Sequence, residues 1–184
     1  MSFRCFGTGD PLYEAYHDTE WGVPPATSAD ERELFERLSL EAFQSGLAWI
    51  TILRKREAFR AAFAGFDPAV VAGFDAADVQ RLMGDAGIVR NRAKIEATIA
   101  NARALLALHQ REEQLAALFE AHRPAARAVR PASFGEVPGS TPESAALAKQ
   151  LKTLGFRFVG PTTAYAAMQA LGYVDDHLAG CLVT

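Results

Sequence analysis

The sequence has 184 residues, of which 49% are hydrophobic and 22% are charged, and its formal net charge is −3. This composition is typical of a globular protein with one substantial core, and the charge excludes a large, uniformly basic surface while permitting a local basic patch. Because the N-terminus has no apolar signal region and no run approaches the ~18 apolar residues of a membrane helix, we expect a cytoplasmic protein without membrane contacts.

Helix-start signals mark the first third of the chain. Asp10-Pro11 places an aspartate at an N-cap and a proline at the first helical position. The helix that follows gathers aromatic side chains, with a histidine at their edge: Tyr13, Tyr16, His17 and Trp21. Such a face forms either a packed cluster beneath the next helix or the wall of a binding site. Ser28 and Glu31 have capping-box spacing and predict a helix from there to about Ser45, with a second helix over about 50–64.

A short turn containing glycine joins two predicted helices over about 75–108. Asp75 with Asp78 starts the first of them. The second is long and carries basic residues near its start: Arg90, Arg92 and Lys94. A tight turn before a helix exposes backbone N–H groups, here near Gly87, and these favour an anion such as phosphate. The segment is therefore a candidate site for the DNA backbone, although any pair of hairpin-linked helices has this pattern.

The last third of the chain also lacks strand patterning. A helix is predicted over 110–123, followed by a connector over 123–139 that is rich in proline and alanine and has no periodicity. Two further helices begin at Thr141-Pro142 and at Gly160-Pro161. The only run with strand character, over 156–159, is too short to count as a strand. The sequence thus predicts an all-α fold.

The stretch over 38–53 is apolar, and Glu41 is its only formal charge. Burying an unpaired carboxylate is costly unless it gains a partner or a raised pKa. Arg37 lies one helical turn before Glu41 and would form an ordinary surface salt bridge with it. Alternatively, Gly46 permits a turn that brings Trp49 over an enclosed Glu41. A carboxylate beside an indole could bind a flat, electron-poor ring. This stretch alone does not decide between the two interpretations.

Two cysteines and two histidines lie towards the ends of the chain: Cys5, His17, His177 and Cys181. A disulfide is disfavoured in a reducing compartment, whereas two thiolates and two imidazoles are a ligand set for tetrahedral Zn²⁺. Four protein ligands leave no open position, so the zinc would be structural and would tie the N-terminal segment to the C-terminal one. Because the gap between Cys5 and His17 is not zinc-finger spacing, the alternative is two free cysteines with unrelated histidines. His109 and His122 are assigned to the surface.

Five segments, in this order, carry a resemblance to a known family: RCF…DPLYEAYHDTEWGVP, LEAFQSGLAWITILRKRE, DAGIVRNRAKI, GFRFVGPTTAYAAMQALG and DDHLAGC. Together they resemble the DNA-3-methyladenine glycosylase I (TAG) family, and the combination of YHDxEWG, LExxQxGLxW and the terminal His-x3-Cys is specific. The resemblance covers nearly the whole chain, and the connector near 124–140 matches least. It implies one helix-hairpin-helix glycosylase domain over 1–184, with two helical lobes around a base-binding pocket.

The resemblance also implies an activity and roles for particular residues. The chain would hydrolyse the N-glycosidic bond of 3-methyladenine in DNA, and the four cysteines and histidines named above would hold a structural zinc. Glu41, as the catalytic residue, and Trp49 would line the base pocket. The same pocket would include aromatic residues of the first helix and its end: Tyr13, Tyr16 and Trp21. Phe6 is a weaker candidate, because the family tends to place Gly-Trp after the cysteine. No catalytic aspartate is nominated, since this family lacks the one found in the wider superfamily.

The implied mechanism begins with extrusion of the damaged base from double-stranded DNA, while the basic hairpin contacts the phosphates. Because N3-methylation makes adenine a cation, stacked rings and an anionic Glu41 would recognise it. We expect a monomer without lyase activity. Three alternatives stay open: a zinc-stabilised module that binds alkylated DNA without cleaving it, a zinc hydrolase that uses Cys5, His17 and His177, and a purely structural interaction module.

Overall fold

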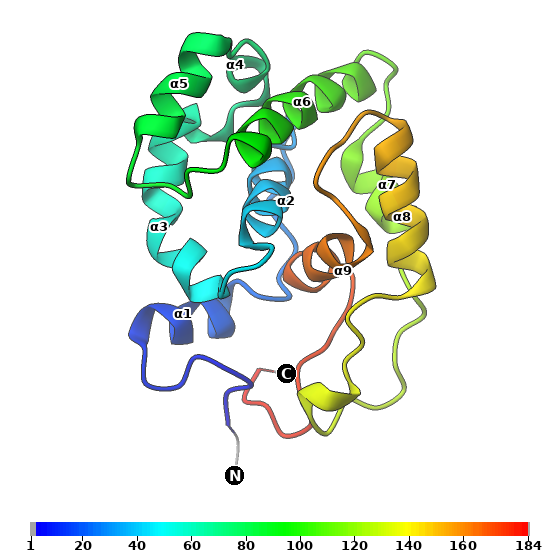
Figure 1. Cartoon of the computed structure of the whole chain (residues 1–184). Coiled ribbons are helices and arrows are strands. Elements are labelled where there is room, and N and C mark those ends of the chain that lie inside the picture. Colours follow the sequence, from blue (N-terminus) through cyan, green and yellow to red (C-terminus); the bar gives the residue numbers. More distant parts are fainter. Residues whose placement is uncertain (1–2, 184) are drawn as a thin grey trace.

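Helices make up all the regular structure of residues 3–183, the part of the chain that the computed structural model describes (Figure 1). The α-helices are α1 (Pro11–Thr19), α2 (Arg32–Gln44), α3 (Trp49–Ala62), α4 (Pro68–Ala72), α5 (Ala76–Gly84), α6 (Arg92–His109), α7 (Leu115–Ala121), α8 (Pro142–Thr153) and α9 (Pro161–Ala170). Two 3₁₀ helices are η1 (Ala64–Phe66) and η2 (Phe134–Glu136). The only β-type pairing among the described residues is an isolated bridge between Phe3 and Cys181. The all-α prediction is confirmed. Among residues 3–183, none of the helices combines the length and the apolar character needed to span a membrane.

Most helix starts lie where the local signals predict them. The Asp10 carboxylate accepts hydrogen bonds from the backbone N–H groups of Leu12 and Tyr13, at 3.1 and 3.2 Å. Asp75 and Thr141 begin α5 and α8 with complete capping boxes. These caps are formed within a few residues of sequence, so the pattern that predicts them also contains both partners.

The capping box predicted at Ser28 and Glu31 is wrong. Helix α2 begins only at Arg32, its N-cap residue Glu31 adopts a left-handed φ of 49°, and the Glu31 side chain makes no cap at this helix. The Glu31 carboxylate instead accepts the backbone N–H groups of Leu115 and Ala116, each at 2.7 Å, and lies 3.0 Å from His109 Nε2. It thereby caps α7, whose predicted start at residue 110 is also too early. His109 is consequently a half-buried partner of Glu31 and not a free surface residue.

Replacing Glu31 by alanine should lower the free energy of unfolding by about 3 kcal/mol, because it leaves two buried N–H groups without an acceptor. Urea unfolding followed by circular dichroism measures this. Glu57→Ala is the matched control: its carboxylate is 81% exposed and pairs only with the neighbouring Arg60, so its loss should cost less than about 1 kcal/mol. Equal midpoints and slopes for the two variants would contradict the assigned role of Glu31.

Helix α2 lies near the centre of the molecule and packs against helices of both sides (Figure 1). It contacts α3 and α6 on one side and α9 on the other, and α8 packs along α9. A group of fully buried phenylalanines fills the space beneath α2 and α3: Phe35, Phe43, Phe59, Phe63 and Phe66. Because α2 is covered on several sides, the apolar run that it carries is explained by packing alone.

The first and last described segments of the chain, near Phe3 and Cys181, lie side by side in the lower part of Figure 1. The Phe3 N–H donates to the Gly180 carbonyl at 3.3 Å, and the Leu182 N–H donates to the Phe3 carbonyl at 2.9 Å. The connector between α7 and α8 crosses the same region, where the Pro131 carbonyl accepts the Ala179 N–H at 2.8 Å. The connector is thus a loop, as predicted, and it holds the C-terminal segment in place.

Candidate functional site

A cavity of about 250 Å³ lies between α1, the turn that joins α2 to α3, and α9. Its walls include every residue that the sequence nominates for a pocket: Phe6, Tyr13, Tyr16, Trp21, Glu41 and Trp49. These residues come from three separate stretches of the chain, and the fold brings them together. Four further residues line the cavity: Gln44, Phe134, Ala166 and Gln169.

Glu41 is enclosed by this site. It lies on the last turns of α2, is 6% exposed, and accepts no hydrogen bond from any residue in 3–183. The surface salt bridge with Arg37 is not formed, because the Arg37 guanidinium pairs with Glu33 and donates to the Val23 carbonyl at 2.7 Å. Between the two interpretations of this stretch, the enclosed carboxyl is the correct one.

Burial raises the pKa of Glu41 from its ordinary value of 4.5 to about 8. The physical cause is desolvation, which penalises the charged form when no partner replaces water. At neutral pH the carboxyl of the free protein is therefore mostly protonated. The expected anionic form of Glu41 would therefore be favoured once a cation occupies the cavity, because a nearby positive charge stabilises the ionised carboxylate.

Aromatic rings form the walls around Glu41. The Tyr16 and Trp49 rings lie 5.3 Å apart between centroids and are tilted by 42°, and Phe6 lies 4.9 Å from Tyr13 and 5.0 Å from Trp21. The turn before Trp49 uses Gly46, whose φ of 85° suits a residue without a Cβ. Trp49 Nε1 is buried and has no hydrogen-bond acceptor within the described chain. The cavity thus combines flat apolar faces with a desolvated acid, and its wall contains the buried, unpaired Trp49 Nε1.

The sequence patterns do not identify two glutamines that line the cavity. Gln44 stands in the same motif as Glu41, one turn further along α2, and its side chain donates to the Leu47 carbonyl at 2.7 Å. Gln169 is the only amide side chain of α9, a helix in which half of the residues are alanine or methionine. A polar residue within an apolar helix is a signal that could have identified it. Phe134 comes from the connector, where no pattern predicts its position.

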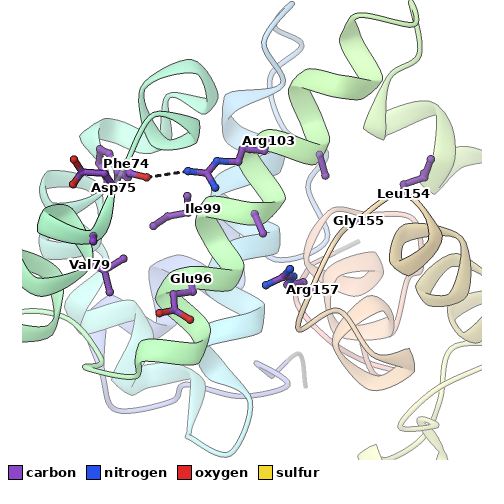
Figure 2. Close-up of a pocket in the computed structure, with 12 residues that line it drawn as sticks. Phe74, Asp75, Val79, Glu96, Ile99, Arg103, Leu154, Gly155 and Arg157 are labelled. Atoms are coloured by element: carbon purple, nitrogen blue, oxygen red, sulfur yellow. Dashed lines mark hydrogen bonds between the residues drawn. The ribbon is translucent and has the colours of Figure 1, made fainter.

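The cavity is not the largest hollow on the surface. A more open one of about 640 Å³ lies between α5, α6 and the loop after α8 (Figure 2). There the Arg103 guanidinium donates to the Phe74 carbonyl at 3.0 Å, and Glu96 and Arg157 lie at the rim. Its charged groups are exposed to solvent and none has the enclosed character of Glu41. The smaller cavity is therefore the better candidate for a binding site.

The predicted metal ligands Cys5, His17, His177 and Cys181 form one cluster, with their ligand atoms within 4.8 Å of one another. Cys181 Sγ lies 3.4 Å from His17 Nε2 and 3.5 Å from His177 Nδ1, and Cys5 Sγ lies 3.7 Å from His177 Nδ1. Zinc bonds of about 2.3 Å to sulfur and 2.0–2.1 Å to nitrogen place tetrahedral ligand atoms roughly 3.6 Å apart. The four side chains therefore have the composition and the spacing to hold a metal ion.

Surrounding groups orient these ligands. Asp18 Oδ1 lies 2.7 Å from His17 Nδ1, which leaves Nε2 of the same ring facing the cluster. Burial lowers the pKa of His177, which favours the neutral imidazole that a metal ligand requires. The cluster also adjoins the cavity, because Phe6 follows Cys5 in the chain and the Trp21 ring lies 4.6 Å from the His177 ring. A metal at this site would fix part of the aromatic wall.

The predicted DNA-contact residues do not all reach the surface. Arg90 and Arg92 are exposed beside the start of α6. Lys94, however, is 7% exposed, and its ammonium donates to the carbonyls of Phe43 and Ser45 at 2.9 and 2.7 Å. It thus caps the C-terminus of α2, where a cation is favoured. The Gly87 N–H is also engaged, since it donates to Asp85 Oδ1 at 2.7 Å.

Comparison with known proteins identifies the family. The family model described as methyladenine glycosylase matches residues 6–184. The DNA-3-methyladenine glycosylase 1 of Escherichia coli (strain K12) is 50% identical over 182 residues, which cover 97% of this chain and 95% of that protein. A crystal structure of 3-methyladenine DNA glycosylase I (TAG) is similar with a TM-score of 0.91, at 49% identity and 98% coverage of each chain. A variant of such an enzyme in complex with 3-methyladenine has a TM-score of 0.89, at 34% identity, and covers 99% of this chain and 97% of its own. The chain therefore belongs to the methyladenine glycosylase family.

Proposed function

We propose that the chain excises 3-methyladenine from alkylated double-stranded DNA, as a monomer without lyase activity. Membership of the family already makes it a glycosylase, that is, a hydrolase of N-glycosyl bonds, with a role in DNA repair. The observation that carries the finer proposal is the enclosed Glu41 carboxyl in a cavity walled by aromatic rings. A cationic purine fits this environment better than a neutral one, because only the cation stabilises the ionised carboxylate.

The damaged base must leave the DNA duplex to reach the cavity. A base within a duplex is inaccessible, so the nucleotide must be flipped out of the stack at a cost of a few kcal/mol. Helices α5 and α6 with the turn between them would serve as the helix-hairpin-helix element on the DNA backbone. Arg90 and Arg92 are exposed there and suit phosphate contacts without sequence preference. Lys94 would act indirectly, by holding the end of α2 that carries Glu41.

Recognition and bond cleavage follow from the charge of the lesion. The rings of Trp49 and Tyr16 would stack on the purine, and Glu41 would lose its proton to solvent water and then accept hydrogen bonds from the base. The glycosidic bond then breaks with its electron pair moving to the base, which leaves as neutral 3-methyladenine. Water adds at the sugar carbon and loses a proton. Among the described residues that line the cavity there is no lysine to form a covalent sugar adduct, which supports hydrolysis without lyase activity.

We propose zinc as the metal of the Cys5, His17, His177 and Cys181 cluster, because thiolate and imidazole ligands favour it. Four protein ligands leave no open coordination position, so the ion would be structural. It would join the segments at the two chain ends to α1, and through Phe6 and Trp21 it would support the aromatic wall. The same closed ligand set argues against a zinc hydrolase.

One experiment distinguishes this enzyme from a module that only binds alkylated DNA. The protein is incubated with methylated DNA, and the released bases are separated by chromatography. Free 3-methyladenine in the supernatant supports the glycosylase. Retention of methylated DNA without release of any base would support the binding module instead.

Trp49→Ala should weaken the affinity for free 3-methyladenine by about tenfold or more, because stacking of a base on an aromatic side chain is worth about 1–3 kcal/mol. Isothermal calorimetry measures the affinity. Phe158→Ala is the control, since this ring is 45% exposed and lies outside the cavity. Equal affinities for the two variants would exclude stacking on Trp49.

A further inference from the structure

We infer that Gln169 contacts the purine directly, and that Asp176 fixes the Gln169 amide so that its carbonyl oxygen faces the base. This inference rests on the proposed function. It adds a specificity residue on α9 and a positioning residue in the C-terminal segment. The pair would select a purine with an amino group at the edge it meets, and reject one with a carbonyl oxygen there.

The first observation is the hydrogen bond between the two residues. Gln169 lines the cavity, and its Nε2 donates to Asp176 Oδ2 at 2.9 Å. Gln169 Oε1 receives no hydrogen bond from residues 3–183, and this oxygen is not fully buried. Oε1 is therefore an unpaired acceptor that keeps some accessible surface, on a residue that lines the cavity. Because the amide nitrogen is bonded to Asp176 and the amide oxygen has no partner, Gln169 can offer a hydrogen-bond acceptor to a ligand in the cavity.

The second observation is the way in which Asp176 itself is held. Its side chain is fully buried, Tyr165 Oη donates to Oδ2 at 2.6 Å, and Arg127 Nη2 lies 3.1 Å from Oδ1. Both hydrogen bonds at Oδ2 come from donors, the Tyr165 hydroxyl and the Gln169 amide nitrogen, and the polar group nearest Oδ1 is a guanidinium, which can only donate. Turning the Gln169 amide over would place its oxygen against this carboxylate. The acceptor role of Asp176 Oδ2 thus disfavours the second orientation of the Gln169 amide.

The chemical consequence concerns the 6-position of the purine. Adenine carries an amino group there, which donates, whereas guanine carries an oxygen, which accepts. Glu41 and Gln169 Oε1 together offer two acceptors, and an exocyclic amine has two N–H groups. A 6-oxo purine would place its oxygen against an acceptor that has no freedom to rotate. Sites built this way discriminate strongly, because the mismatch leaves buried polar groups unpaired. The pair would therefore favour 3-methyladenine over 3-methylguanine.

The test uses the full-length protein and methylated DNA that contains both lesions, with the rates of release of 3-methyladenine and 3-methylguanine measured in one reaction. The ratio of the two rates is independent of the fraction of protein that is folded. Gln169→Leu should lower this ratio about tenfold, as expected for loss of one hydrogen bond to the favoured base. Asp176→Asn should lower it by a similar factor, because an asparagine can donate to Oε1 and let the amide turn over.

Two further variants separate positioning from general damage. In Gln169→Leu/Asp176→Asn the ratio should equal that of Gln169→Leu alone, since Asp176 acts only through Gln169. Tyr165→Phe removes another hydrogen bond to Asp176 and leaves the one from Gln169, so its ratio should stay within about twofold of the wild type. A wild-type ratio in Gln169→Leu overturns the contact, and a wild-type ratio in Asp176→Asn overturns the positioning. Failure of the wild-type protein to release any base would overturn the proposed function as well.

Discussion

Glu41→Gln is expected to lower single-turnover excision of 3-methyladenine by about a hundredfold or more, with the fold unchanged. Glutamine fills the same space but lacks the charge that a cationic purine would meet in a site of low dielectric constant. Removing one preorganised electrostatic partner from such a site typically costs about 10²–10³ in rate. Rapid-quench kinetics with excess enzyme measures the chemical step. An unchanged rate would remove Glu41 from the mechanism.

The same carboxyl gives the reaction a pH dependence. Since burial raises the pKa of Glu41 to about 8, the free enzyme holds this group mostly protonated at pH 6 to 7. The value of kcat/KM reports the ionisation of free enzyme, so it should rise with pH and level off above about 8. Glu41→Gln has no such ionisation, and its residual kcat/KM should lack this rise. A wild-type profile that is flat between pH 6 and 9 would contradict an ionising Glu41.

The stability of the protein should follow the opposite trend. The pKa of Glu41 is higher in the folded state, about 8, than its ordinary value of 4.5, so the folded state binds more protons between these values. The contribution of Glu41 is therefore most favourable below pH 4.5 and is lost as the pH rises through about 8. At pH 8.5 Glu41→Gln should melt at the same temperature as the wild type or above it. Function at this site is thus obtained at a cost in stability.

Helix caps and other interactions between residues that lie close together in the sequence could be predicted. The caps by Asp10, Asp75 and Thr141 each involve residues within one turn, so the sequence pattern contains the whole interaction. The failures are of the opposite kind. Glu31 and Lys94 have the residue type and spacing of a cap and a phosphate contact, but their partners lie on distant elements. The spacing of residues in the sequence does not predict which distant backbone group a charged side chain will bind.

The candidate site shows the same division. Glu41 could be identified because a single charge within an apolar run is anomalous whatever the fold, while the choice between Arg37 and a cavity needed tertiary structure. The metal cluster was predictable from its unusual inventory of ligand types, even though its members lie at opposite ends of the chain. The pairing of Gln169 with Asp176 was not, since glutamine and aspartate are common residues.

Loss of a metal ligand is the second change with a large expected effect. Cys181→Ser should abolish stoichiometric zinc binding and lower the melting temperature by about 10 °C, equivalent to about 3 kcal/mol in a protein of this size. Structural zinc binds the folded state with an apparent free energy on the order of 10 kcal/mol in small domains. The loss should be smaller here, because the helical core around α2 does not depend on the cluster and only the segments at the chain ends are released.

Metal analysis of the purified protein and thermal unfolding with and without a chelator measure both quantities. His122→Gln is the control, because this histidine follows α7, bonds the Leu118 carbonyl of that helix and lies outside the cluster, so zinc content should stay at one per chain. Full zinc occupancy in Cys181→Ser would overturn the ligand set. The affinity for free 3-methyladenine should fall together with the metal, since Phe6 and Trp21 adjoin the ligands Cys5 and His177 and form one wall of the cavity. An apo protein that binds the base with undiminished affinity would show that the cavity holds its shape without the cluster.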